Sequence, residues 1–282
     1  MAEGAYLIEP GVVPYREAWE LQRSLAAAVS QGAIPETVLL LEHPPVVTLG
    51  RRTLPEELRD VPVEIVETDR GGKSTYHGPG QLVCYPILDL KRHGKNVKKY
   101  VRDLEESLIR TLSAFGIEGA RLEGLTGVWL ESPPAASGAS LASAGRGDSA
   151  SSTAPRLERR ERRERPAEPG SARREPDAAG GGGPRKIASI GVHVSRWVTT
   201  HGYALNVDLD PAPFSDWITA CGLENAAFTT MARELGRPVT VDEVRPAAAA
   251  ALEEVFGLAF EDVPADDGPG LWPQPRHAQL AR

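Results

Sequence analysis

The sequence lacks several features that would assign it to common classes of protein. No run of apolar residues is long enough to span a membrane, so no membrane partner is expected. Only two cysteines, Cys84 and Cys221, occur in 282 residues; no disulfide framework is expected, and a cytoplasmic location is the simplest expectation. Glu3 and Glu9 precede the first basic residue, Arg16, which argues against a secretory signal or a transit peptide.

Strong positive charge is also lacking. The net charge is -7, whereas proteins that bind nucleic acid carry a basic surface, so nucleic acid is not expected as a partner. Basic residues nevertheless gather around the start of a predicted helix near residue 96. A solvated face is the ordinary explanation of this group, and steering of an acidic partner is the alternative. Its members are Lys91, Arg92, Lys95, Lys98 and Lys99.

Apolar and aromatic residues are scarce in one internal stretch. Residues 131–185 contain no aromatic residue and no Val, Ile or Met, but are rich in Ala, Ser, Gly, Pro and mixed Arg and Glu. Since this composition cannot form a core, we predict a disordered insertion in a surface loop; its alternating charges favour a solvated linker over an RNA-binding segment. A disordered tail is predicted for residues 262–282, which leaves 1–130 and 186–261 as a single domain.

Apolar periodicity predicts the elements of that domain. Helices are expected from Pro14 to Val29, from 96 to 115, and from a capping box of Thr240 and Glu243 to Phe256, with short helices at 214–217 and 226–234. Strands are expected at 5–9, 37–41, 46–49, 63–66, 82–88, 127–130, 186–194 and 197–207, with a hairpin-like return at 198–200. This mixed order indicates an α/β or α+β fold.

The most distinctive stretch runs from Arg70 to Leu82 and reads RGGKSTYHGPGQL. Its four glycines let the backbone approach a ligand, and the interleaved polar side chains supply hydrogen-bonding groups, so we interpret it as the wall of a substrate site outside the core. An ordinary tight connection between strands is the alternative. A phosphate-binding P-loop is excluded, because Glu67 stands where that motif needs glycine and His77-Gly78-Pro79-Gly80 breaks the helix that should follow.

Other reactive side chains have ordinary explanations when each is taken alone. Arg51 and Arg52 fit a solvated turn, and Lys186 opens a strand as a solvent-facing lysine often does. His201 stands beside a glycine within a strand pattern, where a hydrogen-bonded structural role is usual. Cys221 lies in a turn of small residues, whereas Cys84 lies within an apolar strand and fits an inert, buried thiol.

Together these motifs resemble the lipoyl(octanoyl) transferases, which are relatives of the lipoate and biotin protein ligases. The resemblance is carried by residues 43–51, 70–82, 127–129, 186–191, 201–206 and 221–222. It implies a single α/β (α+β) domain with a mixed, largely antiparallel sheet flanked by helices, like the catalytic domain of those ligases. Ala220 departs from the family, which usually has proline before the nucleophile.

The resemblance implies a ping-pong acyl transfer that needs neither cofactor nor metal. Octanoyl would move from octanoyl-acyl carrier protein to Cys221, and then to a lysine of lipoyl domains in 2-oxoacid dehydrogenases or of the glycine cleavage H protein. Lys186 would favour the thiolate or carry its proton, and the enzyme would be a monomer. The implied acyl-binding residues are Arg70, Gly71, Gly72, Lys73, Ser74, Thr75, Tyr76, His77, Ser189, Ile190, Gly191, Gly202, Tyr203 and Ala204.

Two other functions remain as alternatives. An ATP-dependent lipoate or biotin ligase would share the fold, but we would expect a third glycine in place of Lys73 and an aspartate in place of Gly78. A non-catalytic module that binds lipoyl domains would need neither Cys221 nor Lys186, so the presence of both favours an enzyme.

Overall fold

The computed structural model describes residues 3–131, 183–219 and 227–264. Nearly all of the predicted insertion and most of the predicted tail lie outside these residues. The strands are β1 Glu3–Val12, β2 Glu36–Glu42, β3 Val46–Leu49, β4 Glu64–Glu67, β5 Thr75–His77, β6 Gln81–Ile87, β7 Val128–Leu130, β8 Arg185–Ser195, β9 Val198–Asn206, β10 Ala227–Phe228 and β11 Leu258–Asp262. The helices are α1 Tyr15–Ser30, α2 Val97–Ser113, α3 Pro213–Asp216, α4 Met231–Leu235 and α5 Val241–Phe256.

A large mixed sheet forms the centre of the fold. Its strand order is β10-β8-β9-β6-β2-β1-β11, with β7 paired to β8, and a second sheet has the order β4-β3-β5. The central neighbours β2, β6, β9 and β8 are antiparallel, whereas β1 is parallel to both β2 and β11. The fold is therefore α+β with a mixed sheet, as predicted, and its largely antiparallel part is the centre.

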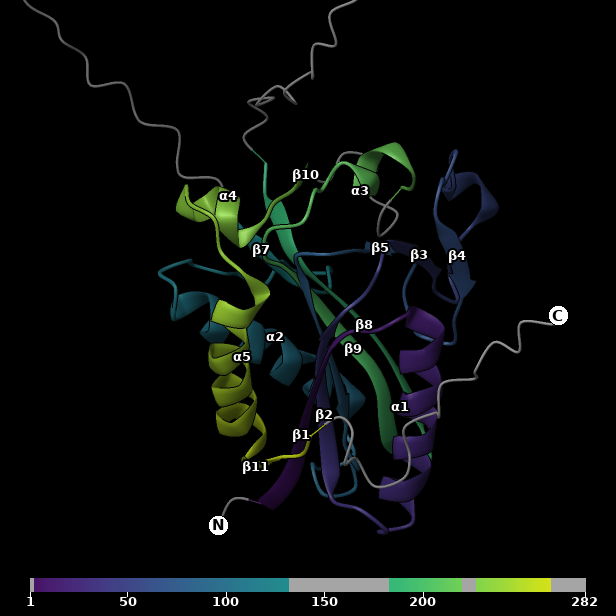
Figure 1. Ribbon diagram of the computed structural model, residues 1–282, viewed down its shortest axis with the longest axis vertical. Coiled ribbons are helices and arrows are strands. Elements are labelled where there is room, and N and C mark those ends of the chain that lie inside the picture. The colour runs from purple at the N-terminus through teal and green to yellow at the C-terminus, as the bar shows by residue number, and fades with distance from the viewer. Residues whose placement is uncertain (1–2, 132–182, 220–226, 265–282) are drawn as a thin grey trace, which may run out of the picture. The chain divides into compact units, whose positions relative to one another are not determined.

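Helices cover both faces of the large sheet. Figure 1 shows α1 on one side and α2 and α5 on the other. Val38 and Leu40 of β2 pack with the cluster under α2 and α5, while Leu39 and Leu41 pack with the cluster under α1. A strand buried on both faces has no polar alternation, which explains the continuous apolar run of β2. None of the described helices has the length and apolar character needed to cross a membrane.

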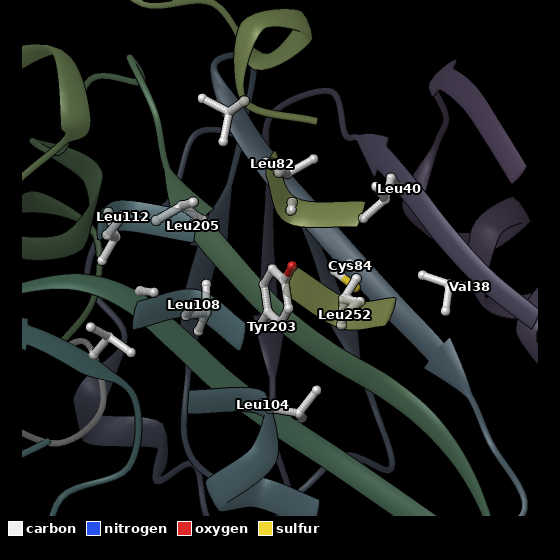
Figure 2. Packing of buried hydrophobic residues seen from close by; sticks show 14 of the residues in the cluster. Val38, Leu40, Leu82, Cys84, Leu104, Leu108, Leu112, Tyr203, Leu205 and Leu252 are labelled. Carbon is white, nitrogen blue, oxygen red and sulfur yellow. The ribbon is translucent and has the colours of Figure 1, made fainter. Parts of the chain in front are cut away.

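The larger core cluster lies between the sheet and the helices α2 and α5. Leu104, Leu108 and Leu112, spaced about one helical turn apart along α2, belong to the same buried cluster as Cys84 and Tyr203 of the sheet (Figure 2). Cys84 is 0% exposed, and burial raises the pKa of its thiol far above the ordinary value. The predicted burial of Cys84 is confirmed.

Two predicted local structures are wrong. The return between β8 and β9 is made by Arg196 and Trp197, both with positive φ, and not by residues 198–200; Ser195 pairs directly with Val198. The β-branched residues of 198–200 suit a strand, and a two-residue turn with positive φ matches the twist of a hairpin. The helix predicted at 226–234 begins only at Met231, because the side chain of Thr230 caps it.

The stretch after Arg70 also contributes to the core, contrary to the prediction. Thr75–His77 forms β5, which pairs antiparallel with β3, and all three residues are buried. Tyr76 belongs to a core cluster with Val47, Phe214 and Ile218. Three residues suffice for this strand because β3 supplies its hydrogen-bond partners, which the glycine-rich local sequence does not reveal.

Candidate functional site

A cavity of about 390 Å³ opens where segments distant in the sequence converge. Its wall is formed by the turn before β5, by β8 and β9, by one residue of α2, and by the loop before β7. The residues that line it are Arg52, Arg70, Gly71, Gly72, Lys73, Ser74, Thr75, His77, Val101, Gly124, Leu125, Thr126, Trp129, Lys186, Ser189, Ile190, Gly191, Val192, Gly202, Tyr203 and Ala204.

The cavity gathers the predicted site residues from three separate stretches of the chain. Lys186 and every predicted acyl-binding residue except Tyr76 line it. The pleat of β5 explains the exception, since neighbouring side chains point to opposite sides. Thr75 and His77 face the cavity, whereas the Tyr76 ring packs edge-on against Trp217, with centroids 5.4 Å apart. Tyr76 is therefore corrected from a cavity residue to a core residue.

Several lining residues were missed by the sequence analysis. Arg52, whose ordinary explanation was a solvated turn, borders the cavity as an exposed residue, and Val101, Leu125 and Trp129 add apolar wall. Val101 lies in the helix predicted at 96–115, but that prediction did not indicate a cavity beside it. Residues 124–126 carry no motif that would have marked them.

Lys186 is held in the sheet with its amine inside the fold. It is 3% exposed and pairs across strands with Trp129, whose ring centroid lies 5.1 Å from Lys186 Nζ. A cation over the face of an indole ring is electrostatically favourable. Arg185, the preceding residue, donates to both carboxylate oxygens of Glu234, with Nη2–Oε2 at 2.9 Å and Nε–Oε1 at 3.1 Å, which anchors the start of β8.

Gly127 packs directly against this lysine. A Cβ atom on Gly127 would lie 2.4 Å from the Ala188 carbonyl oxygen and 2.9 Å from Lys186 Cε, and the residue has a φ of +113°. Neither contact leaves room for a side chain, and only glycine adopts this backbone conformation without strain. The buried carboxylate of Glu105 accepts from the Gly127 N–H at 3.2 Å.

Gly127→Ala is expected to destabilise the protein by about 3 kcal/mol or more and to displace the Lys186 side chain, through backbone strain combined with the two clashes. Gly116→Ala is the matched control, because Gly116 has a φ of +77° with nothing within 4 Å of a Cβ. That control should cost about 1–2 kcal/mol. Chemical denaturation of both variants measures the difference, and equal losses would contradict the proposed contact with Lys186.

The Arg70 side chain organises the glycine-rich turn from inside. It is 7% exposed, and its Nη1 donates to the carbonyl oxygens of Lys73 at 2.7 Å and Gly71 at 3.1 Å. Its Nη2 donates to the carbonyl oxygen of Thr48 at 2.8 Å. Because one planar guanidinium binds oxygens of two segments, it fixes the turn against β3. The neighbouring Lys73 forms an ion pair with the buried carboxylate of Glu57.

His77 contributes a neutral ring to the cavity. Its Nδ1 lies 2.8 Å from Gln81 Oε1, and Gln81 Nε2 donates to Asn206 Oδ1 at 3.0 Å. Burial lowers the pKa of His77 well below its ordinary value. The imidazole therefore stays uncharged at neutral pH, and His77 serves as a positioned hydrogen-bonding group rather than a cation.

Two further histidines, His43 and His201, are buried and do not line the cavity. Burial lowers the pKa of His43 to about 4, and its Nδ1 donates to the Val13 carbonyl oxygen at 2.6 Å. His201 Nε2 lies 2.7 Å from Asp69 Oδ1, and this hydrogen bond lowers the pKa of Asp69 to about 2. Burial lowers the pKa of His201 itself. The expected structural, hydrogen-bonded role of His201 agrees with these contacts.

Cys221 lies outside the described residues, and Ala220 does as well. The described chain before them ends at Thr219, whose N–H donates to the Glu57 carbonyl oxygen at 2.8 Å. The chain after them resumes in β10, where Phe228 pairs with Lys186. The described residues include no group of three or more His, Cys, Asp or Glu side chains placed to hold a metal ion.

A family model for the lipoyl protein ligase A/B catalytic domain matches residues 14–253. The chain belongs to this family. Its similar curated relatives include the octanoyltransferase of Streptomyces coelicolor, 48% identical over 86% of this chain and 89% of that protein. An octanoyltransferase of Mycobacterium tuberculosis is 44% identical over 86% of this chain and 83% of that protein. The octanoyltransferase of Chloroflexus aurantiacus is 39% identical over 88% of this chain and 92% of that protein.

Solved structures of the lipoyl protein ligase family share the fold. A bipartite lipoate protein ligase from Thermoplasma acidophilum superposes with a TM-score of 0.60 at 14% identity, covering 94% of this chain and 88% of that one. Lipoate-protein ligase A bound with ATP superposes with a TM-score of 0.56 at 13% identity, covering 94% and 89%. The family and the fold class inferred from the sequence are thus both confirmed.

Proposed function

We propose that this protein transfers an octanoyl group from octanoyl-acyl carrier protein to a lysine of a lipoyl domain, through a thioester on Cys221. The protein is an acyltransferase that moves octanoyl groups in protein lipoylation, the activity supported by relatives 39–48% identical over most of its length. The single structural observation that carries the proposal is the convergence of Lys186 with three predicted acyl-binding segments on one cavity.

The first half-reaction makes the acyl-enzyme. An ordinary thiol with a pKa near 8.5 is only about 3% ionised at pH 7, so the nucleophile needs help. In the proposal the Lys186 ammonium favours the Cys221 thiolate, which attacks the thioester carbonyl carbon. The carbon–sulfur bond of the donor breaks, and its pantetheine sulfur leaves with the electron pair and takes the proton of the Lys186 ammonium, which leaves the Lys186 amine neutral for the second half-reaction.

The second half-reaction regenerates the enzyme. A neutral lysine amine of the acceptor attacks the carbonyl carbon of the Cys221 thioester, and an amide forms as the cysteine sulfur leaves. The acceptor nitrogen gives up one proton, and we propose that Lys186 is the group placed to receive or relay it. Since the donor thioester is already activated, neither ATP nor a metal is required.

The proposal extends to partners and chain organisation. The acceptors are lipoyl domains of 2-oxoacid dehydrogenases and the glycine cleavage H protein. The enzyme acts on them as a monomer in the cytoplasm. Residues 1–130 and 186–261 form its single catalytic domain. Arg185 in β8 and Asp262 in β11 extend the ordered chain by one residue beyond two of the predicted boundaries. Exposed basic residues, Arg52 at the cavity among them, suit an acidic carrier protein.

An ATP-dependent ligase is the second candidate, because solved neighbours with this fold include such ligases. Lys73 and Gly78 argue against it, since we expect glycine and aspartate at these positions of a ligase. A direct test incubates the protein with octanoyl-acyl carrier protein without ATP and measures its intact mass. The proposal expects an octanoyl adduct that hydroxylamine removes; activity only with free octanoate plus ATP would favour the ligase.

A further inference from the structure

Three lining residues, Ser74, Thr75 and Tyr203, carry a buried hydroxyl with no hydrogen-bond partner among the described residues. Tyr203 belongs to the larger core cluster, whereas Ser74 and Thr75 are neighbours in the glycine-rich stretch. Ser74 and Thr75 both line the cavity and are only 0% and 7% exposed. Neither Ser74 Oγ nor Thr75 Oγ1 has a hydrogen-bond partner among the residues that the structure describes. A buried hydroxyl without a partner is unusual, because its removal from water is uncompensated. Two adjacent ones on the same cavity wall indicate a ligand that carries a hydrogen-bond acceptor.

The backbone that carries these hydroxyls is held on both sides. Arg70 Nη1 donates to the carbonyl oxygen of Lys73, immediately before Ser74, at 2.7 Å. Thr75 is paired across strands with Thr48 in the small sheet. Groups held in this way need little reorganisation when a ligand arrives, which is the property required of donors that stabilise developing charge.

The rest of the wall restricts the chemistry of the ligand. Val101, Leu125 and Ile190 present apolar side chains to the cavity, so a hydrocarbon chain fits there. The amine of Lys73 is engaged by Glu57, and the guanidinium of Arg70 by backbone oxygens. Neutral hydroxyl donors beside an apolar wall suit a hydrocarbon chain that ends in an uncharged carbonyl.

We propose that the hydroxyls of Ser74 and Thr75 donate hydrogen bonds to the carbonyl oxygen of the bound acyl thioester. This inference rests on the proposed function and assigns the oxygen-binding groups of that same site. As the nucleophile's sulfur bonds to the carbonyl carbon, the π electron pair moves onto the oxygen, and both hydrogen bonds strengthen. The pair returns to the carbon–oxygen bond when the donor sulfur leaves, and the two hydroxyls keep their protons throughout.

Two ligands with the same eight-carbon chain, of which only one carries the carbonyl, test the assignment. Octanoyl-amide pantetheine keeps the carbonyl in a non-reactive form, whereas octyl-thioether pantetheine keeps the eight-carbon chain and lacks it. Calorimetry measures both affinities for the wild type, Ser74→Ala and Thr75→Val. In each variant the ratio of the amide affinity to the thioether affinity should fall about 3- to 10-fold, while the thioether affinity itself stays unchanged. The double variant should also form the octanoyl adduct roughly 100-fold more slowly.

Thr53→Val is the matched control, because Thr53 Oγ1 is likewise buried with no partner in the described part of the chain but does not line the cavity. Its amide-to-thioether ratio should equal that of the wild type, and Thr75→Ser, which keeps a hydroxyl, should restore most of the ratio. An equal loss of affinity for both ligands would indicate a merely structural role and overturn the assignment. An unchanged affinity ratio in both variants would overturn it as well. A wild type that forms no octanoyl adduct would instead refute the proposed function, independently of these ratios.

Discussion

Cys221→Ser is expected to form no octanoyl thioester and to lose at least about a thousandfold in transfer rate. A serine hydroxyl stays protonated at neutral pH, where the thiolate is the proposed nucleophile. Intact mass after incubation with octanoyl-acyl carrier protein measures the adduct, and peptide mapping locates it. A hydroxylamine-labile adduct of unchanged yield on the serine variant would refute the assignment of Cys221.

Cys84→Ala is the matched control, since Cys84 is the other cysteine of the chain. Its thiol is fully buried, and this burial raises the pKa of the thiol and disfavours the thiolate. The variant should form the adduct at the wild-type yield while losing about 1 kcal/mol of stability from the vacated core volume. Loss of the adduct in a folded Cys84→Ala variant would show that the two cysteines had been assigned wrongly.

Lys186→Met should slow acyl-enzyme formation by about 10²- to 10⁴-fold, the range expected for removal of a group that assists proton transfer. Methionine approximates the length of the lysine stem and can still pack over Trp129, so the loss reports the amine rather than the contact. The pH dependence of Cys221 alkylation by iodoacetamide provides the second readout. If Lys186 favours the thiolate, the apparent pKa of that alkylation should rise toward 8.5 in the variant.

Lys99→Met controls for removal of a positive charge as such. Lys99 is an exposed residue of α2 that pairs with Asp103, and its side chain is 59% exposed. Its removal should leave the alkylation profile unchanged and alter the transfer rate by no more than about twofold. If Lys186→Met and Lys99→Met behave alike, Lys186 has no special part in the chemistry.

The site was largely predictable because its residues are close together in sequence within each motif. The glycine-rich stretch by itself predicted the wall of a site, and the family resemblance implied the lining residues of the two hairpin strands. Tyr76 was misplaced because its direction depends on the pleat of a strand that exists only by pairing with β3. The missed β11 likewise depends on its partner, since Leu258–Asp262 forms a strand along β1.

Contacts between distant residues had no signal in the sequence. Tyr15 OH and His201 Nδ1 lie 3.3 Å apart although 186 positions separate the two residues. The ring of Tyr15 also packs against the ring of His43, with centroids 5.0 Å apart. Such a cluster of aromatic and imidazole side chains is assembled by sheet topology, which apolar periodicity does not specify.

The pairing of β7 with β8 has a consequence for how this chain can vary in length. Leu130 and Arg185 are opposite each other in the register, so the intervening residues leave and re-enter the sheet at one place. Each doubling of such a loop costs only about 0.6 kcal/mol of closure entropy. The position of β8, the strand that carries Lys186, is fixed by its pairing with the neighbouring strands and by the Arg185–Glu234 ion pair. Evolution or protein engineering can therefore lengthen, shorten or replace this segment while Lys186 keeps its position.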